Sequence, residues 1–199
     1  MALPKTGYTK DTANNFIIDA GMIFTDISYS DTDGFSGTPL GATSGGVSVN
    51  IEQSMRRVEV DSAYIMPVMG LNVMESANCT VTANLKELTA ENLRLAINGT
   101  MEDADETEAP DGYKKITTKR YIEEGDYIPS VAIVGTHSGT KEPVIFMLDN
   151  GLVTSALEMA TTDNNEATIE VTIQANASYD QLAADEFPWR IYHPGNMSA

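Results

Sequence analysis

The fold is decided within residues 42–98, whose first strand-like segment reads Val47-Ser48-Val49-Asn50-Ile51-Glu52. Apolar and polar side chains alternate there with the period of two that a β-strand has, so its three apolar members share one face. The alternation resumes over residues 57–61, after an expected bend at residues 53–56, and it returns over residues 78–85. The segment therefore predicts strands that bury one face and expose a polar one.

A helix is expected over residues 89–98, directly after these strands. Leu93, Ala96 and Ile97 recur there at helical spacing, and Thr89 stands where a helix N-cap accepts a backbone hydrogen bond. Gly99 is a natural stop. The change of period predicts one short helix packed against the apolar side of a sheet.

The rest of the chain also favours β-structure, with Gly, Asn and Asp turn signals between its segments. Residues 168–177 alternate most clearly, and Asp149-Asn150-Gly151 predicts a hairpin turn because Asn-Gly accommodates positive φ angles. The further expected strands cover residues 16–24, 115–122, 127–135, 143–149 and 152–157.

The predicted organisation is one mainly β domain with loops and terminal arms. Residues 30–46 and the acidic residues 100–112 contain turn-forming or charged side chains and predict loops. The domain is expected to span residues 16–177, with an N-terminal arm at 1–15 and a C-terminal arm at 178–199.

Composition limits the classes of function. The 199 residues include 12 basic and 29 acidic side chains, for a net charge of −17, which argues against an adhesive or sequence-specific nucleic-acid surface. No apolar run approaches the ~20 residues that span a bilayer, so no membrane partner is expected. The first residues lack a secretory signal, and the one cysteine, Cys79, fits a reducing cytoplasm and a small core residue.

Residues suited to catalysis or metal binding form no diagnostic pattern. His137 and His193 have no acidic or nucleophilic partner at a telling spacing, and Ser138 is one position late for a nucleophile elbow. The acidic residues of the 100–112 segment lack the ligand spacing of a calcium loop. We therefore expect no enzyme activity, no cofactor and no metal site.

Three segments in order resemble the major tail proteins, or tail tube proteins, of long-tailed bacteriophages. They are Gly-Ala-Thr-Ser-Gly-Gly-Val at residues 41–47, Arg-Val-Glu-Val-Asp at 57–61 and Leu-Lys-Glu-Leu-Thr-Ala-Glu-Asn-Leu-Arg-Leu-Ala at 85–96. The close match covers about a third of the chain, and residues 16–24 look like the opening strand of that family. The signal is the order and spacing of the segments.

The resemblance implies a tail-tube-type β-sandwich or half-barrel sheet that polymerises. Six copies would close a ring, rings would stack into a tube in the virion tail, and a long loop near 30–46 would contact the neighbouring ring. Implied partners are further copies of the chain, the tape measure, tail terminator and distal tail proteins, and double-stranded DNA that passes without specific binding. Assembly would take place in the cytoplasm of the host bacterium.

Strand parity then selects candidates for the surface that faces the lumen of the tube. Arg57 departs from a purely acidic wall, and pairing with Glu59 on the same face would neutralise it. The full candidate set is Ser48, Asn50, Glu52, Arg57, Glu59, Asp61, Thr80, Thr82, Glu170 and Gln174.

Other classes of protein share this β pattern. A monomeric β-sandwich binding module would use the 30–46 segment or the acidic loop to hold calcium or a glycan. A head-to-tail completion protein or a secretion-system tube subunit would share the fold of a tail tube protein. From composition alone, the acidic excess also fits a plain solubility role.

Overall fold

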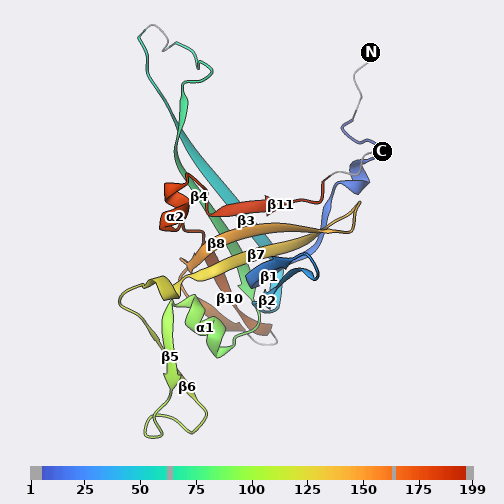
Figure 1. The fold of residues 1–199 in the computed structure, drawn as a ribbon. Coiled ribbons are helices and arrows are strands. Elements are labelled where there is room, and N and C mark those ends of the chain that lie inside the picture. The colour runs from blue at the N-terminus through green and yellow to red at the C-terminus, as the bar shows by residue number, and fades with distance from the viewer. Residues whose placement is uncertain (1–5, 62–64, 163–164, 196–199) are drawn as a thin grey trace.

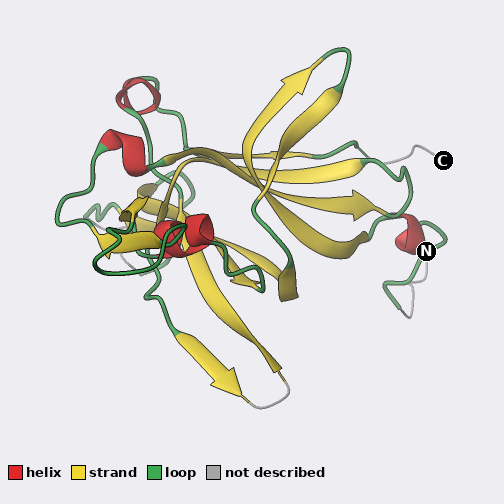
Figure 2. Cartoon of the chain, turned by 90° about the horizontal axis from the view of Figure 1, so that it is seen from below, coloured by secondary structure: helices red, strands yellow, loops and turns green. Residues whose placement is uncertain are grey.

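The computed structural model describes residues 6–61, 65–162 and 165–195. Strands dominate it, as expected, and its helices are short (Figure 2). No helix among these residues is long and apolar enough to cross a membrane. The strands are β1 (Ile17–Ser30), β2 (Gly34–Pro39), β3 (Thr43–Arg57), β4 (Asn72–Leu85), β5 (Gly99–Asp103), β6 (Lys114–Thr118), β7 (Ile128–His137), β8 (Pro143–Val153), β9 (Met159–Thr162), β10 (Asn165–Gln174) and β11 (Trp189–Tyr192). The helices are α1 (Ala90–Ala96), α2 (Tyr179–Ala183) and the 3-10 turns η1 (Thr12–Asn14) and η2 (Glu124–Asp126).

The main sheet is antiparallel and runs in the order β2-β1-β7-β8-β10-β4-β3. β11 adds to β8, β9 adds to β10, and β5 and β6 form a separate hairpin. The β3–β4 hairpin and the β5–β6 hairpin extend from opposite ends of the body (Figure 1). The mainly β fold class is thus confirmed, with a short helix beside the sheet.

β8 joins the two halves of the main sheet, which are β2-β1-β7-β8 on one side and β8-β10-β4-β3 on the other. Most of its length pairs with β7, whereas Leu152 and Val153 pair with β10. Asn150 adopts the positive φ of 47° that its sequence suggests, but it lies inside a continuous strand. The hairpin turn predicted at this point is therefore wrong: the unusual backbone occurs where β8 passes from one partner to the other.

Gly151 explains why that passage needs glycine. A Cβ atom there would lie 2.8 Å from Cγ2 of Ile173 and 2.9 Å from Cγ2 of Val131. The two halves of the sheet therefore meet over a residue without a side chain.

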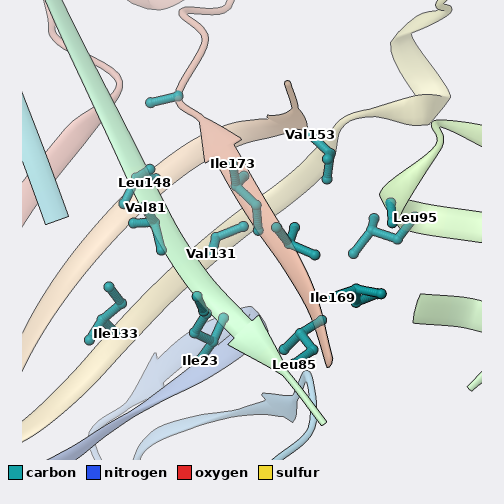
Figure 3. Packing of buried hydrophobic residues seen from close by; sticks show 14 of the residues in the cluster. Ile23, Val81, Leu85, Leu95, Val131, Ile133, Leu148, Val153, Ile169 and Ile173 are labelled. Atoms are coloured by element: carbon teal, nitrogen blue, oxygen red, sulfur yellow. The ribbon is translucent and has the colours of Figure 1, made fainter. Parts of the chain in front are cut away.

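The hydrophobic core lies between these two halves. Ile23 and Val131 come from one half and Val81 and Ile173 from the other, and each is at most 2% exposed. Figure 3 shows these side chains converging from different strands. Their burial gives the two packed layers of the expected sandwich.

Helix α1 closes one end of this core. Its N-cap is Thr89, as predicted, and the Thr89 side chain accepts a hydrogen bond from the backbone N–H of Asn92 at 3.1 Å. The buried Asn92 amide donates in turn to the carbonyl oxygens of Leu40 and Glu87, at 3.1 and 2.8 Å. Leu95 is buried in the main cluster, so α1 is anchored by both apolar and polar contacts.

The loop predicted over residues 30–46 is wrong, because it contains β2 and the start of β3. Asp31–Asp33 form the turn, and β2 then pairs back along β1. The rings of Tyr29 and Phe35 touch across this hairpin, with centroids 5.0 Å apart. β2 is an exposed edge strand, so burial imposed no alternating pattern on its Gly-, Ser- and Thr-rich sequence.

The acidic segment 100–112 is likewise more ordered than predicted. Its first residues belong to β5, which pairs with β6 in a two-stranded hairpin. Lys114 forms an ion pair with Asp103, and Nζ of Lys115 lies 2.7 Å from a carboxylate oxygen of Glu108. Two lysines at the start of β6 thus partly balance the acidic charge of this segment. The expected loop included no such ion pairs.

The predicted C-terminal arm also folds onto the body, with contacts through residue 193. β11 pairs with β8 from Trp189↔Leu148 to Tyr192↔Ile145, and Trp189 packs against the main core. Nη1 of Arg190 donates to the carboxylate of the buried Asp149 at 2.5 Å. Residues 196–199 lie outside the described range.

At the N-terminus, residues 6–15 contain η1 and run beside the turn after β7. The hydroxyl of Ser138 donates to the carbonyl oxygen of Ala13 at 2.8 Å and accepts from the N–H of Phe16 at 2.9 Å. The second half of the expected arm is therefore tied to the domain, while residues 1–5 lie outside the described range.

Candidate assembly surface

One continuous polar surface crosses β3, β4 and β10. Directly paired residues of neighbouring strands point to the same side of a sheet, so each row can be read from the register. One row is Ser48↔Thr82↔Thr172 and the next is Asn50↔Thr80↔Gln174. We call this surface the polar face; it consists of Ser44, Ser48, Asn50, Glu52, Asn78, Thr80, Thr82, Asn84, Glu170, Thr172 and Gln174.

The opposite side of the same three strands is apolar and faces the core. Between the two polar rows lies the row Val49↔Val81↔Ile173, in which Val81 and Ile173 are fully buried. The alternation seen in the sequence is therefore a real division between two faces. The core fixes which side of the strands remains available for other contacts.

Hydroxyl and amide groups dominate the polar face. The hydroxyl oxygens of Thr82 and Thr172 are 2.9 Å apart, and the Asn50 amide donates to the Glu52 carboxylate at 2.9 Å. Its charged members are Glu52 and Glu170; Arg56 has the same parity on β3 but lies beyond the irregularity at Glu75, in the outer part of the hairpin. This chemistry binds water and repels anions weakly, and it offers phosphate groups no cation to hold.

Seven of the ten candidate residues lie on this face. They are Ser48, Asn50, Glu52, Thr80, Thr82, Glu170 and Gln174. Sequence reasoning missed Ser44, Asn78, Asn84 and Thr172, although their parity along the same strands carried the signal.

The other three candidates are corrected. β3 continues to Arg57 without the bend expected at 53–56, so Arg57 lies five residues beyond Glu52 and on the opposite face of the strand. The irregularity is in β4, where Glu75 is the extra residue between Ser76 and Met74. Glu59 and Asp61 follow the end of β3 and belong to no strand, so the expected Arg57–Glu59 pair on a shared strand face is also wrong.

The polar face borders a free strand edge. Among the described residues, β3 pairs with β4 and with no other strand, and it stands at one end of the main sheet. β2 stands at the other end. Such edges present unpaired backbone groups on which another strand can add.

The outer part of the β3–β4 hairpin forms a second surface of different character. We call its described residues 55–61 and 65–74 the hairpin tip. Met69 is 99% exposed and Ile65 79% exposed, and both strands leave the body there (Figure 1). Its other exposed apolar residues are Met55, Val60, Met66, Val68, Val73 and Met74. An apolar group of this size on an isolated two-stranded ribbon marks a contact surface.

The reactive side chains considered from the sequence are buried or held in contacts within the fold. Cys79 is buried on the core side of β4, and desolvation raises the pKa of its thiol to about 11, which disfavours the nucleophilic thiolate. His137 is buried, accepts from the N–H of Thr140 at 3.2 Å, and meets the ring of His193 edge-on. The described residues contain no group of three or more His, Cys, Asp or Glu arranged to hold a metal ion.

Comparison with known proteins gives distant structural likenesses. A scan of protein-family models and a search of curated proteins find no match. The chain is similar to one in the cryo-EM structure of the anti-feeding prophage baseplate, with 12% identity, a TM-score of 0.41, and coverage of 96% of this chain and 97% of that one. It is also similar to a chain in the virion of a native gene transfer agent particle, with 12% identity, a TM-score of 0.39, and coverage of 79% and 92%. Likenesses this distant carry no conclusion about function.

Proposed function

We propose that the chain is a structural subunit of a bacteriophage tail, and that it polymerises as stacked hexameric rings whose bore carries double-stranded DNA during ejection. The sequence resemblance suggests this class of protein. The polar face is the observation that carries the proposal. Its residues come from three adjacent strands, and all of them lie on the side of those strands that faces away from the core.

The chemistry of the polar face suits a DNA conduit. A wall that made several lysine or arginine contacts with phosphates would hold the duplex strongly. Hydroxyls, amides and two carboxylates instead repel it weakly, since a like-charge contact at 4 Å costs about 1 kcal/mol in water and is screened beyond about 8 Å. DNA is thereby kept from adhering while it remains free to slide.

The free edge of β3 supplies a means of ring closure. β3 is the outermost strand of the polar face. Adding a neighbour's strand at its free edge therefore extends the polar face from one copy to the next. Closure also removes the exposed edge, which would otherwise invite uncontrolled pairing. The hairpin tip takes the ring-to-ring role that the resemblance had suggested for residues 30–46.

The remaining partners follow from a tail of this kind. A tube needs proteins that set its length and close its two ends, which are the tape measure, tail terminator and distal tail proteins. The copies would assemble in the host cytoplasm and become part of the virion tail.

The test reverses charge on the polar face. In Glu52→Lys/Glu170→Lys tubes, the new cations face the bore, so we expect tubes of normal appearance by negative-stain electron microscopy that retain duplex DNA at low salt. Wild-type tubes should not retain it. The matched control is Glu106→Lys/Asp111→Lys, which makes the same charge change in the β5–β6 turn.

Two results would contradict the proposal. One is a wild-type protein that stays dispersed at every concentration and ionic strength tested. The other is retention of DNA by the control tubes to the same extent as by the polar-face variant, because the bore would then not be lined by β3, β4 and β10.

A further inference from the structure

A groove of about 440 Å³ lies beside α2 and β11, next to the outer end of the polar face. Its walls come from β4, from the segment after β10, from α2 and from the connection into β11. Asn78 and Gln174 reach it from the polar face. We call it the α2–β11 groove.

The groove combines aromatic and acidic groups. The rings of Phe187 and Trp189 stack with centroids 4.9 Å apart, and Phe187 is 50% exposed. Leu182 adds an aliphatic side chain that is 70% exposed. Asp185 and Glu186 line the same groove, and neither forms an ion pair within the described part of the chain.

An occupant that matches this lining must be apolar and basic together. Thioether sulfur makes favourable contacts with aromatic rings, and a guanidinium group pairs with carboxylates and stacks on aromatic faces. A purely apolar ligand would leave the two carboxylates without partners, and an acidic ligand would be repelled.

The hairpin tip of this chain, which includes Arg56, offers both kinds of group. Met66 and Met69 are 65% and 99% exposed, and Arg56 is exposed on the same ribbon. The tip also carries Arg57, Glu59 and Asp61, so its net charge is zero and the basic group available to the carboxylates is Arg56 itself rather than the tip as a whole. Figure 1 shows the hairpin running past α2 and away from the body, which directs the tip toward another molecule.

We propose that the α2–β11 groove receives the hairpin tip of a second copy of this chain. The methionines of the tip pack on Phe187 and Trp189, and Arg56 pairs with Asp185 and Glu186. Because the two surfaces differ, the contact is head-to-tail and repeats from copy to copy. This inference rests on the proposed polymer and names the surfaces that join its subunits.

A charge-swap experiment tests the contact with the full chain. Arg56→Glu and Glu186→Arg each place like charges together, and each should raise the concentration needed for association about tenfold or more. Combining them restores an opposite-charge pair and should bring that concentration back to within about threefold of wild type. Sedimentation velocity over a concentration series measures association, and electron microscopy records whether tubes form.

Matched controls separate a local contact from a general effect of charge. Lys10→Glu and Asp111→Arg make the same charge changes away from both surfaces. Each should associate like wild type. Far-ultraviolet circular dichroism and thermal midpoints establish that every variant is folded, and Met69→Ser removes the thioether without altering charge.

The outcomes separate the two proposals. If wild type forms tubes and the single reversals form them equally well, the groove does not receive the tip, while the tail function stands. The groove contact is also ruled out if both single reversals weaken association and the double variant does not recover. If wild type never associates, both proposals fail.

Discussion

The inner and outer halves of β4 differ in how deeply their side chains are buried. In the inner half, residues 79–85, alternate side chains are fully buried and face the core, with Val81 and Leu85 at 0% exposure. In the outer half, residues 72–76, both faces of the strand are exposed, including Met74 at 40%. One strand thus serves as core element at one end and as free surface at the other.

The difference lies in what covers each half. The inner half lies between β3 and β10, and the other half of the sheet packs across its apolar side. The outer half pairs with β3 but has no third strand beside it among the described residues. Because a two-stranded ribbon is marginal alone, we infer that the inner half holds the fold and that the outer half contributes to assembly.

The largest effect should follow from removing buried volume in the inner region. Ile173→Ala deletes a fully buried side chain from β10 opposite Val81, so we expect a loss of about 2–5 kcal/mol in the free energy of unfolding. Urea denaturation monitored by circular dichroism measures it. A loss below about 1 kcal/mol would mean that the region between the two halves is not the core.

A smaller effect is expected at the passage of β8 between its partners. Gly151→Ala places a methyl group 2.8 Å from Ile173 and 2.9 Å from Val131, which is closer than carbon atoms tolerate. We expect a loss of about 1–3 kcal/mol, measured in the same way. A variant as stable as wild type would show that the two halves lie further apart than described.

The base of the β5–β6 hairpin should respond to acid. Nζ of Lys119 donates to Asp126 at 2.6 Å and the N–H of Glu123 donates at 2.9 Å, and these hydrogen bonds lower the pKa of the Asp126 carboxyl. Its stabilising contribution is therefore present above the unfolded pKa of about 3.9 and is lost as pH falls through the lower folded value.

The corresponding measurement is the thermal midpoint between about pH 7 and about pH 2. Asp126→Asn removes the titrating group, so its midpoint should fall less than that of wild type over the acid part of this range. Parallel curves for the two proteins would mean that this carboxyl does not contribute.

The smallest effect on stability is expected at the hairpin tip. Met69 is 99% exposed, so Met69→Ser should leave the free energy of unfolding within about 0.5 kcal/mol of wild type. Its association should nevertheless weaken, because the side chain is expected to meet another copy. A large loss of stability in the monomer would place the tip in the fold rather than in the interface.

Alternation of apolar and polar residues correctly predicted the strands that pack one face against the core. Ile169, Val171, Ile173 and Ala175 are all buried at β10 and the residue after it, as their spacing indicated. The N-cap at Thr89 was equally readable, because a capping side chain acts within one turn of its helix.

Prediction failed where a tertiary partner defines the element. β2 and β11 are held by pairing with β1 and β8, and their own sequences carry no alternating pattern that would have indicated a strand. Asn150 carries a correct signal for unusual backbone, yet the same dihedral preference serves a turn or a distortion within a strand.

The candidate surface was affected in the same way. Parity works within one uninterrupted strand, so residues of β3, β4 and β10 were assigned to a shared side correctly. The expected bend before Arg57 shifted the parity of every residue after it. The true irregularity, at Glu75 on the partner strand, leaves no signature in the sequence of β3.

Cryo-electron microscopy of the purified chain at high concentration tests the central claim most directly. We predict hollow stacked rings of six copies, in which Asn50, Thr82 and Gln174 line the bore. Tubes whose bore is lined by other strands, or a protein that remains monomeric under all assembly conditions, would contradict the account.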